Sequence, residues 1–391
     1  MDYSKYLNPA AASLPQSGIR RFFDLAANIP DCISLGVGEP DFATPWEIRD
    51  AAIKSIQLGR TQYTSNAGLL SLREEIAGYL SSRFKADYDP KTEIIVTIGA
   101  SEAIDLALRT LVTAGDEVLI PSPSYVSYAP NAATDGGAAV PLETRAEEDF
   151  VLTPEILEKA ITPRSKVLIL PYPNNPTGAI MTREQLEKIA DVIEKHDLFV
   201  ISDEIYAELT YGERHASFAA IPGMKKRTVL INGFSKAFAM TGWRLGYFCA
   251  PEPVAKAAYK IHQYTIMCAP TASQIAGEAA LRSGREDDYR AVTEMRESYD
   301  IRRRYLYNKF NEMGLKTFEP RGAFYVFPSV ESTGLTGERF AEGLLKSKKV
   351  AVVPGSAFGS GGKNFIRCSY ATSLADLKTA TERIKEFLKE I

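Results

Sequence analysis

The sequence predicts an α/β protein in which a mainly parallel sheet lies between layers of helices, with a smaller α+β part after it. Two observations support this fold class. Short apolar runs rich in Val and Ile recur between residues 93 and 232, as in strands that are buried on both faces. Amphipathic helical patterns separate several of these runs, and such alternation is typical of parallel sheets with helical connections.

The elements of the sheet follow in chain order. A helix is expected over residues 101–112 and another over 182–196, where Thr182 and Gln185 form a capping-box pattern. The predicted strands are residues 93–99, 117–121, 166–171, 198–203 and 227–232. Each of these runs is too short for a helix and is rich in β-branched residues, which favours a strand.

The C-terminal part has a different pattern. A long charged helix is predicted over residues 287–313, followed by strands at 323–328 and 365–370 and a last helix from Leu374. We therefore expect a large α/β domain over residues 45–285. A small α+β domain would combine residues 1–44 with 286–391, with the N-terminal segment lying over the active site.

Composition excludes several classes of function. The chain has 391 residues with a net charge of −3, so no basic excess indicates nucleic acid or an anionic membrane. Its four cysteines lack a CxxC pair and its three histidines form no ligand-spaced cluster, so no metal is expected. We find no signal-like segment and no apolar run long enough to cross a bilayer. We therefore expect a soluble, cytoplasmic protein with reduced thiols.

One stretch, Ser235-Lys236-Ala-Phe-Ala-Met-Thr-Gly-Trp-Arg244, combines groups that suit a phosphorylated aldehyde. Its lysine follows a hydroxyl residue and precedes an arginine by eight positions. A lysine amine condenses with an aldehyde to form a Schiff base, and a guanidinium pairs with phosphate. Pyridoxal phosphate (PLP) carries both groups. A single lysine is usually a surface charge, so the prediction depends on the rest of the chain.

Other polar residues stand where predicted strands end. Asp203 closes one strand, Asn175 follows another, and Lys236 follows a third by a short turn. Ligands of open α/β sheets bind beyond the carboxyl ends of the strands, so these residues should converge. We assign Asp203 to the ring nitrogen of PLP, because a carboxylate there stabilises the protonated ring. Taken singly, each residue also fits an ordinary strand-end turn.

A phosphate site is predicted at the start of the helix that begins near residue 100. Free backbone N–H groups at a helix N-terminus bind phosphate, and Ala100, Ser101 and Glu102 form this turn. Ser235 and Arg244 would complete the phosphate cup. The simpler explanation of Gly-Ala-Ser is a strand-to-helix turn.

Together these motifs resemble the class I/II aminotransferases, in that family's order and spacing from Gly38 to Arg367. The resemblance is to the prokaryotic aspartate-aminotransferase-like branch, and within it to the bacterial PatA-type enzymes. It implies PLP fold type I, with a seven-stranded sheet, and a homodimer. It also implies that Tyr63, in Tyr-Thr-Ser-Asn-Ala-Gly, reaches the cofactor phosphate of the neighbouring subunit, so that each site needs two chains.

The resemblance assigns further roles at the cofactor. Asn175, in Asn-Pro-Thr-Gly, contacts the phenolic oxygen of PLP and the substrate carboxylate, and Tyr206 bonds the same oxygen. Tyr125 stacks on the ring face. Arg367, in a predicted apolar strand, grips the substrate α-carboxylate with two parallel bonds that a lysine could not form. The backbone of Gly38 approaches the substrate.

The activity implied is ping-pong transfer of an amino group from an L-amino acid, or an N-acyl-diamino acid, to a 2-oxo acid such as 2-oxoglutarate. Lys236 would act as acid and base, with Asp203 and Tyr206 as the other catalytic residues. Aspartate-preferring enzymes of this branch have a lysine where this chain has Ser101, which argues against strict aspartate specificity.

Three questions stay open from the sequence. A carbon–sulfur β-lyase of the same fold uses the same motifs. A PLP-binding regulatory module is the second alternative, although we find neither a basic patch nor a DNA-binding domain. Arg20 and Arg21 could contact a distal substrate carboxylate if the N-terminal segment folds over the site, or they could form a solvated charge pair.

Overall fold

A seven-stranded sheet forms the centre of the larger part of the chain, and the computed structural model describes residues 1–16, 18–19 and 29–391. The strand order is β2-β8-β7-β6-β5-β3-β4, and only β8 runs against the others in this sheet. The strands are β2 (Ile94–Thr97), β3 (Glu117–Ser122), β4 (Ala138–Glu143), β5 (Ser165–Leu170), β6 (Phe199–Asp203), β7 (Thr228–Gly233) and β8 (Gly246–Cys249). The mainly parallel α/β fold predicted from the sequence is confirmed.

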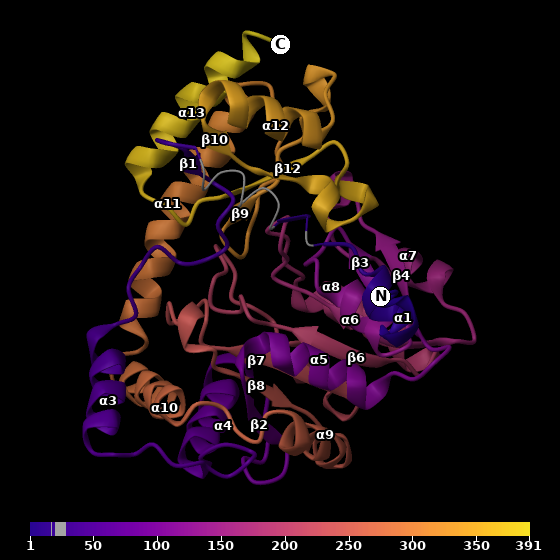
Figure 1. Cartoon of the computed structure of the whole chain (residues 1–391), viewed down its shortest axis with the longest axis vertical. Coiled ribbons are helices and arrows are strands. Elements are labelled where there is room, and N and C mark those ends of the chain that lie inside the picture. Colours follow the sequence, from indigo (N-terminus) through magenta and orange to yellow (C-terminus); the bar gives the residue numbers. More distant parts are fainter. Residues whose placement is uncertain (17, 20–28) are drawn as a thin grey trace.

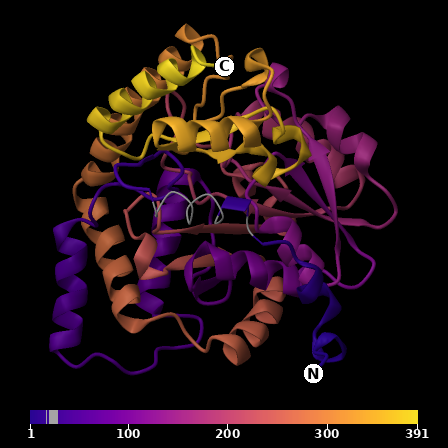
Figure 2. The same ribbon diagram turned by 45° about the horizontal axis from the view of Figure 1, so that its top comes forward.

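Helices cover both faces of this sheet (Figures 1 and 2). Alternate residues of the strands face opposite layers: Leu168 packs in the cluster that contains α8, and Val167 packs in the cluster that contains α5. The helices are α3 (Trp46–Gln57), α4 (Leu70–Phe84), α5 (Gly99–Leu111), α6 (Tyr128–Thr134), α7 (Pro154–Ala160), α8 (Arg183–Lys195), α9 (Glu252–Thr265) and α10 (Thr271–Glu286). The capping box predicted at Thr182 is present at the start of α8.

The smaller part lies at the top of Figure 1 and is built on α11 (Arg290–Glu312), α12 (Gly337–Lys348) and α13 (Leu374–Leu388). Its antiparallel sheet has the order β11-β12-β9, and a separate parallel pair joins β1 to β10. These strands are short: β1 (Ile33–Ser34), β9 (Tyr325–Val326), β10 (Val350–Ala351), β11 (Val353–Pro354) and β12 (Ile366–Ser369). The strand expected over residues 323–328 is thus limited to two residues.

The long helix α11 runs from the lower to the upper part of the chain (Figure 1). The division into domains at residues 45 and 285 stays a proposal, supported by two features. Helix α3 packs against α10 in the lower part, and α11 begins four residues after α10 ends. The segment of residues 29–42 places β1 beside β10 in the smaller part and then leads down toward α3 (Figure 1).

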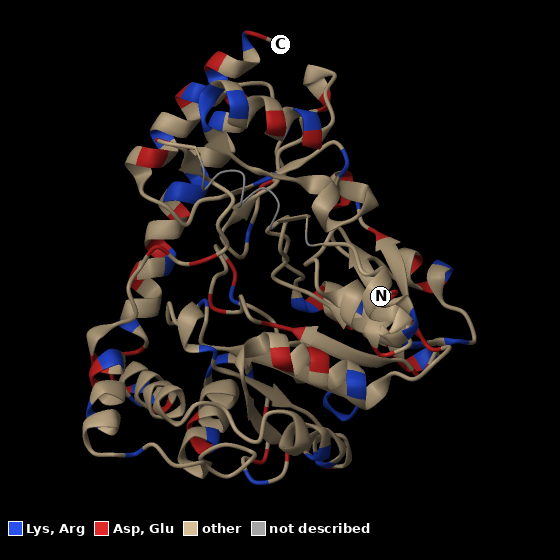
Figure 3. Cartoon of the chain, viewed as in Figure 1, with Lys and Arg blue, Asp and Glu red and all other residues tan. Residues whose placement is uncertain are grey.

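Charges of both signs are interspersed along α11, α12 and α13 (Figure 3). None of the helices that the structure describes is long and apolar enough to cross a membrane. A short helix, α1 (Pro9–Ser13), lies near α6.

Candidate active site

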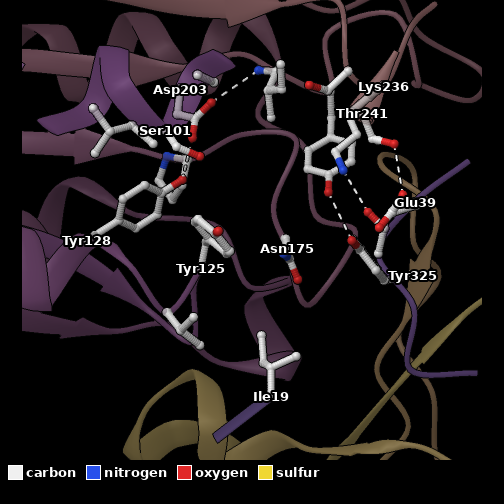
Figure 4. Close-up of a pocket in the computed structure, with 18 of the residues that line it drawn as sticks. Ile19, Glu39, Ser101, Tyr125, Tyr128, Asn175, Asp203, Lys236, Thr241 and Tyr325 are labelled. Atoms are coloured by element: carbon white, nitrogen blue, oxygen red, sulfur yellow. Dashed lines mark hydrogen bonds between the residues drawn. The ribbon is translucent and has the colours of Figure 1, made fainter. Parts of the chain in front are cut away.

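A cavity of about 1290 Å³ opens beyond the carboxyl ends of β5, β6 and β7 (Figure 4). Side chains from both parts line it. Eleven of the residues singled out from the sequence are among them: Gly38, Ala100, Ser101, Tyr125, Asn175, Asp203, Tyr206, Ser235, Lys236, Arg244 and Arg367. The convergence expected at the carboxyl edge of a parallel sheet is therefore present in the structure.

Lys236 extends into this cavity from the turn after β7 (Figure 4). Its Nζ donates a hydrogen bond of 2.6 Å to the Gly38 carbonyl and lies 5.7 Å from the ring centre of Tyr206. Burial disfavours the ammonium form and lowers the pKa of Lys236 to about 8. A fraction of the Lys236 side chains is therefore unprotonated near pH 7, and the neutral amine is the form that can act as a nucleophile or base.

Asp203 ends β6 with its carboxylate beside the cavity (Figure 4). One oxygen accepts a 2.7 Å bond from the Tyr128 hydroxyl, and the other accepts a 3.2 Å bond from the Ile205 N–H. Burial raises the pKa of Asp203 to about 6, although both bonds oppose the shift. An ionised carboxylate in this place is costly without a cationic partner.

Tyr128 is a site residue that the sequence analysis missed. It opens α6 and lines the cavity, and its ring contacts that of Tyr125 edge to face at 5.7 Å between centres. The two tyrosines are three residues apart, and the Tyr128 N–H donates to the Tyr125 carbonyl at 3.5 Å, so they lie at the two ends of one turn. That spacing was the available signal, but nothing in the sequence connected Tyr128 with Asp203.

The first turn of α5 faces the cavity next to Arg244. The first N–H groups of a helix have no partner inside it, so those at Gly99, Ala100 and Ser101 suit an anion. A Cβ at Gly99, where φ is +70°, would lie 2.7 Å from the Arg244 Nη2 atom. Glycine is therefore needed for the guanidinium to lie against this helix end. The Glu102 side chain turns away from the cavity and contacts His262 instead.

Arg367, on β12, is 2% exposed and carries an unpartnered nitrogen. Its two terminal nitrogens donate to the Asn175 side-chain oxygen at 2.8 Å and to the Gly36 carbonyl at 2.5 Å. Its Nε is buried without a hydrogen-bond partner among the described residues. A buried guanidinium with spare donors fits a carboxylate ligand.

Two further contacts shape the wall opposite Asp203. The hydroxyls of Tyr206 and Tyr325 lie 2.9 Å apart, and a Cβ at Gly38 would lie 2.7 Å from the Tyr325 hydroxyl. Tyr325 was also missed by the sequence analysis. Glycine at position 38 thus leaves the backbone close to the cavity, and its contact with substrate stays a prediction.

Two of the predicted cofactor-binding residues, Glu102 and Tyr63, do not line this cavity. Tyr63 is 81% exposed and lines a separate groove beside α3 and α10. Arg20 and Arg21 lie outside the described residues. Among the residues that the structure describes, no cluster of three or more His, Cys, Asp or Glu side chains could hold a metal ion.

The donor set fits PLP, because each group of the cofactor has a chemically matched partner. A lysine amine with a lowered pKa suits the aldehyde, a buried carboxylate suits the ring nitrogen, and a helix N-terminus beside an arginine suits the phosphate. This site, at the carboxyl edge of this sheet, defines an enzyme of PLP fold type I.

Comparison with known proteins gives the family. Residues 30–384 match the family of class I and II aminotransferases, and the chain belongs to it. The chain is 51% identical over 385 residues to YugH of Bacillus subtilis, covering 98% of this chain and 99% of that one. It is 46% identical to aromatic-amino-acid aminotransferase 2 of Thermococcus litoralis, over 96% of each chain. The aspartate aminotransferase of Thermus thermophilus, solved with maleate, superposes with a TM-score of 0.93 at 37% identity, over 97% of this chain and 99% of that one.

Membership in this family establishes the reaction class. The protein is an aminotransferase, so it transfers an amino group between amino acids and oxo acids. The enzymes of this family depend on PLP. The aminotransferase relatives do not favour the alternative of a carbon–sulfur lyase.

Proposed function

We propose that this protein holds PLP on Lys236 and transfers the amino group of an L-amino acid to 2-oxoglutarate. The observation that carries the proposal is Lys236, a buried amine whose pKa is lowered to about 8 within the same cavity as Asp203 and Arg367. When bound, PLP supplies an electron sink for the charge that develops at the substrate Cα. The remaining chemistry falls to the residues of this chain.

Four groups would hold the cofactor. The α5 N-terminus, Ser235 and Arg244 would bind the phosphate. Asp203 would pair with the ring nitrogen, and Tyr128 orients its carboxylate through their 2.7 Å bond. Tyr125 would pack on the ring and exclude water from it. Asn175 and Tyr206 would hydrogen-bond the phenolic oxygen.

Substrate binding and proton transfer use the opposite wall. Arg367 binds the α-carboxylate with its guanidinium, while its existing bond to Asn175 limits its rotation. The backbone of Gly38 borders the same space, because its carbonyl already lies within 2.6 Å of Lys236 Nζ. The neutral Lys236 amine would take the Cα proton of the amino acid and deliver it to the C4′ carbon of the cofactor within the same half-reaction. In the second half-reaction it would move a proton in the reverse direction, from C4′ to the Cα of the oxo acid.

The donor class is broad rather than strictly acidic. The family resemblance implies a lysine in aspartate-preferring enzymes where this chain has Ser101, and aromatic as well as aspartate aminotransferases are among the similar proteins. We include N-acyl-diamino acids among the donors to be tested. Four free cysteines favour a reducing compartment, and we place the enzyme in the cytoplasm.

A homodimer with shared sites is part of the proposal. The supporting feature is a set of exposed apolar side chains, Tyr63 among them, since exposed apolar surface commonly marks subunit contacts. It includes Trp46, Ile56, Leu58, Tyr63 and Tyr264, which are 57%, 58%, 70%, 81% and 87% exposed. Sedimentation equilibrium should give twice the chain mass of 43.0 kDa. A species at the monomer mass would remove the shared site from the proposal.

The cofactor assignment is tested by borohydride reduction of the protein loaded with PLP. Reduction fixes a lysine–PLP Schiff base as a stable secondary amine, and peptide mass spectrometry then locates it. We expect the modification on Lys236 in the wild type and its loss in Lys236→Ala. Modification of another lysine, with Lys236 unmodified, would contradict the assignment.

A further inference from the structure

A buried pair outside the cavity connects the phosphate-binding end of α5 with the loop that carries Tyr63. His262, on α9, is fully buried, and Glu102, in the first turns of α5, is 11% exposed at its side chain. The His262 Nδ1 atom lies 2.5 Å from a Glu102 oxygen, and the Nε2 atom lies 2.8 Å from the Asn66 carbonyl. Glu102 thus has a structural partner that the sequence analysis did not anticipate.

The hydrogen-bond chemistry fixes the orientation of this ring. A backbone carbonyl only accepts, so His262 must donate from Nε2 to Asn66. One proton also lies between Nδ1 and Glu102, either as an imidazolium–carboxylate pair or as a neutral pair. In both cases a flip or rotation of the ring breaks two buried bonds, which is costly.

Glu102 also acts on the helix end itself. Its second carboxylate oxygen accepts from the backbone N–H of Ile98, the residue that precedes α5. The next N–H groups, at Gly99, Ala100 and Ser101, belong to the first turn of α5, where Ala100 and Ser101 line the cavity. The close approach of Gly246, where a Cβ would lie 2.6 Å from the Ala100 nitrogen, fixes the opposite side of the turn.

The other end of the connection is the loop of residues 62–68, which leads into α4. The Asn66 side chain donates to the Met267 carbonyl at 2.8 Å, just after α9. The Gln274 amide donates to the Thr64 hydroxyl at 2.9 Å, and Thr271 donates to the Gln62 carbonyl at 2.7 Å. These bonds hold the backbone on both sides of Tyr63, while the tyrosine ring projects into solvent.

We propose that Glu102 and His262 are positioning residues that hold the α5 N-terminus and the Tyr63 loop as one unit. Through this unit, each subunit shapes its own phosphate site and at the same time presents Tyr63 to the site of its partner. The inference rests on the proposed PLP-binding homodimer and adds two residues that touch neither cofactor nor substrate. It makes cofactor affinity, rather than turnover, the property that they control.

The test is a titration of the cofactor-free protein with PLP, in which the visible absorption band measures how much cofactor is bound. We expect Glu102→Ala and His262→Ala each to raise the dissociation constant for PLP by about 10-fold or more, while turnover at saturating PLP changes less than threefold. Glu102→Gln should retain near-wild-type affinity, because its amide can donate to Nδ1 while its oxygen accepts from Ile98. The variant that carries both alanines should bind PLP no more weakly than the single variant with the lower PLP affinity. Each single substitution already breaks the same Glu102–His262 contact, so their effects should not add.

The connection to Tyr63 is tested in a Tyr63→Phe background. If His262 acts partly through this loop, His262→Ala should raise the dissociation constant less in that background than in the wild type. If His262→Ala raised the dissociation constant for PLP equally in both backgrounds, His262 would act only on the phosphate site of its own subunit. That result would overturn the coupling to Tyr63. Should His262→Ala fail to fold, Glu102→Ala carries the same comparison.

A matched control separates positioning from stability. Arg83 and Glu208 form a buried ion pair of 2.7 Å outside the cavity, so Arg83→Ala should lower the unfolding temperature without changing PLP affinity. Unchanged PLP affinity in both Glu102→Ala and His262→Ala would overturn the inference. Failure of the wild type to bind PLP would instead refute the proposed function.

Discussion

Replacing Asp203 by asparagine should stabilise the cofactor-free protein and at the same time remove most of its activity. Burial raises the pKa of this carboxyl from 3.8 to about 6. Ionised Asp203 therefore lowers the free energy of unfolding at neutral pH. At about 1.36 kcal/mol per pKa unit, the cost at pH 7 is about 3 kcal/mol. Asparagine keeps both hydrogen bonds, because its oxygen can accept from Ile205 while its amide donates to the Tyr128 hydroxyl.

The pH dependence of this gain has a definite sign. Between pH 3.8 and about 6 the folded protein binds more protons at Asp203 than the unfolded chain, so stability of the wild type decreases as pH rises through that range. Above pH 6 the carboxyl is ionised in both states and the cost is fully present. The advantage of Asp203→Asn should therefore be largest at pH 7 and decline toward pH 4.

Thermal unfolding of the cofactor-free proteins at one protein concentration measures the effect. With about 2.1 cal/mol/K of unfolding entropy per residue over 391 residues, about 3 kcal/mol corresponds to an increase of about 4 °C. Turnover at saturating PLP should fall by roughly 100-fold, the loss expected for one electrostatic contact in an active site. A variant that is less stable at pH 7, or whose gain does not change toward pH 4, would refute the argument.

A half-buried carboxyl, that of Asp135, provides the control for this prediction. Burial also raises the pKa of Asp135 to about 6, but this residue does not line the cavity. Asp135→Asn should therefore increase stability at pH 7 without reducing turnover. Loss of turnover in both variants would mean that the effect of Asp203→Asn is not specific to the site.

Three further predictions follow from the site. Lys236→Ala should abolish turnover in a coupled transamination assay while PLP still binds noncovalently; full activity would contradict the role of this lysine. Arg367→Lys should raise KM for amino acids about 10- to 100-fold in steady-state kinetics, since a charge-assisted bond contributes about 1.5–3 kcal/mol, and an unchanged KM would exclude carboxylate binding. Tyr128→Phe should lower kcat by roughly 10-fold through loss of a buried bond to Asp203, whereas Tyr79→Phe, which breaks a tyrosine–carboxylate bond outside the cavity, should not.

Much of the fold was predictable because its signals are local. Five of the seven sheet strands are apolar runs that the sequence displays directly. The edge strand β4 was missed, because most of its side chains are exposed and it therefore lacks a buried strand's pattern. The antiparallel strand β8 (Gly246–Cys249) is only four residues long. It was missed because its pairing with β2 and β7 depends on distant partners.

The site was predictable where it depends on the ends of parallel strands. That rule brings Asp203, Asn175 and Lys236 to one cavity, although their roles stay predictions. The direction of the Glu102 side chain was not predictable, because it is set by His262, which lies 160 residues further along the chain. The contacts of Tyr128 and Tyr325 likewise join segments whose proximity only the folded chain reveals.

The most direct test of the central claim is the absorption spectrum of the protein with PLP, before and after single amino acids are added without an oxo-acid acceptor. We predict a visible band that depends on Lys236 and that an amino-acid donor converts to the near-ultraviolet band of the aminated cofactor, with one oxo acid released per site. The amino acids that cause the conversion would define the donor class. A protein that forms no visible band with PLP, or whose band is unchanged by Lys236→Ala, would contradict the account.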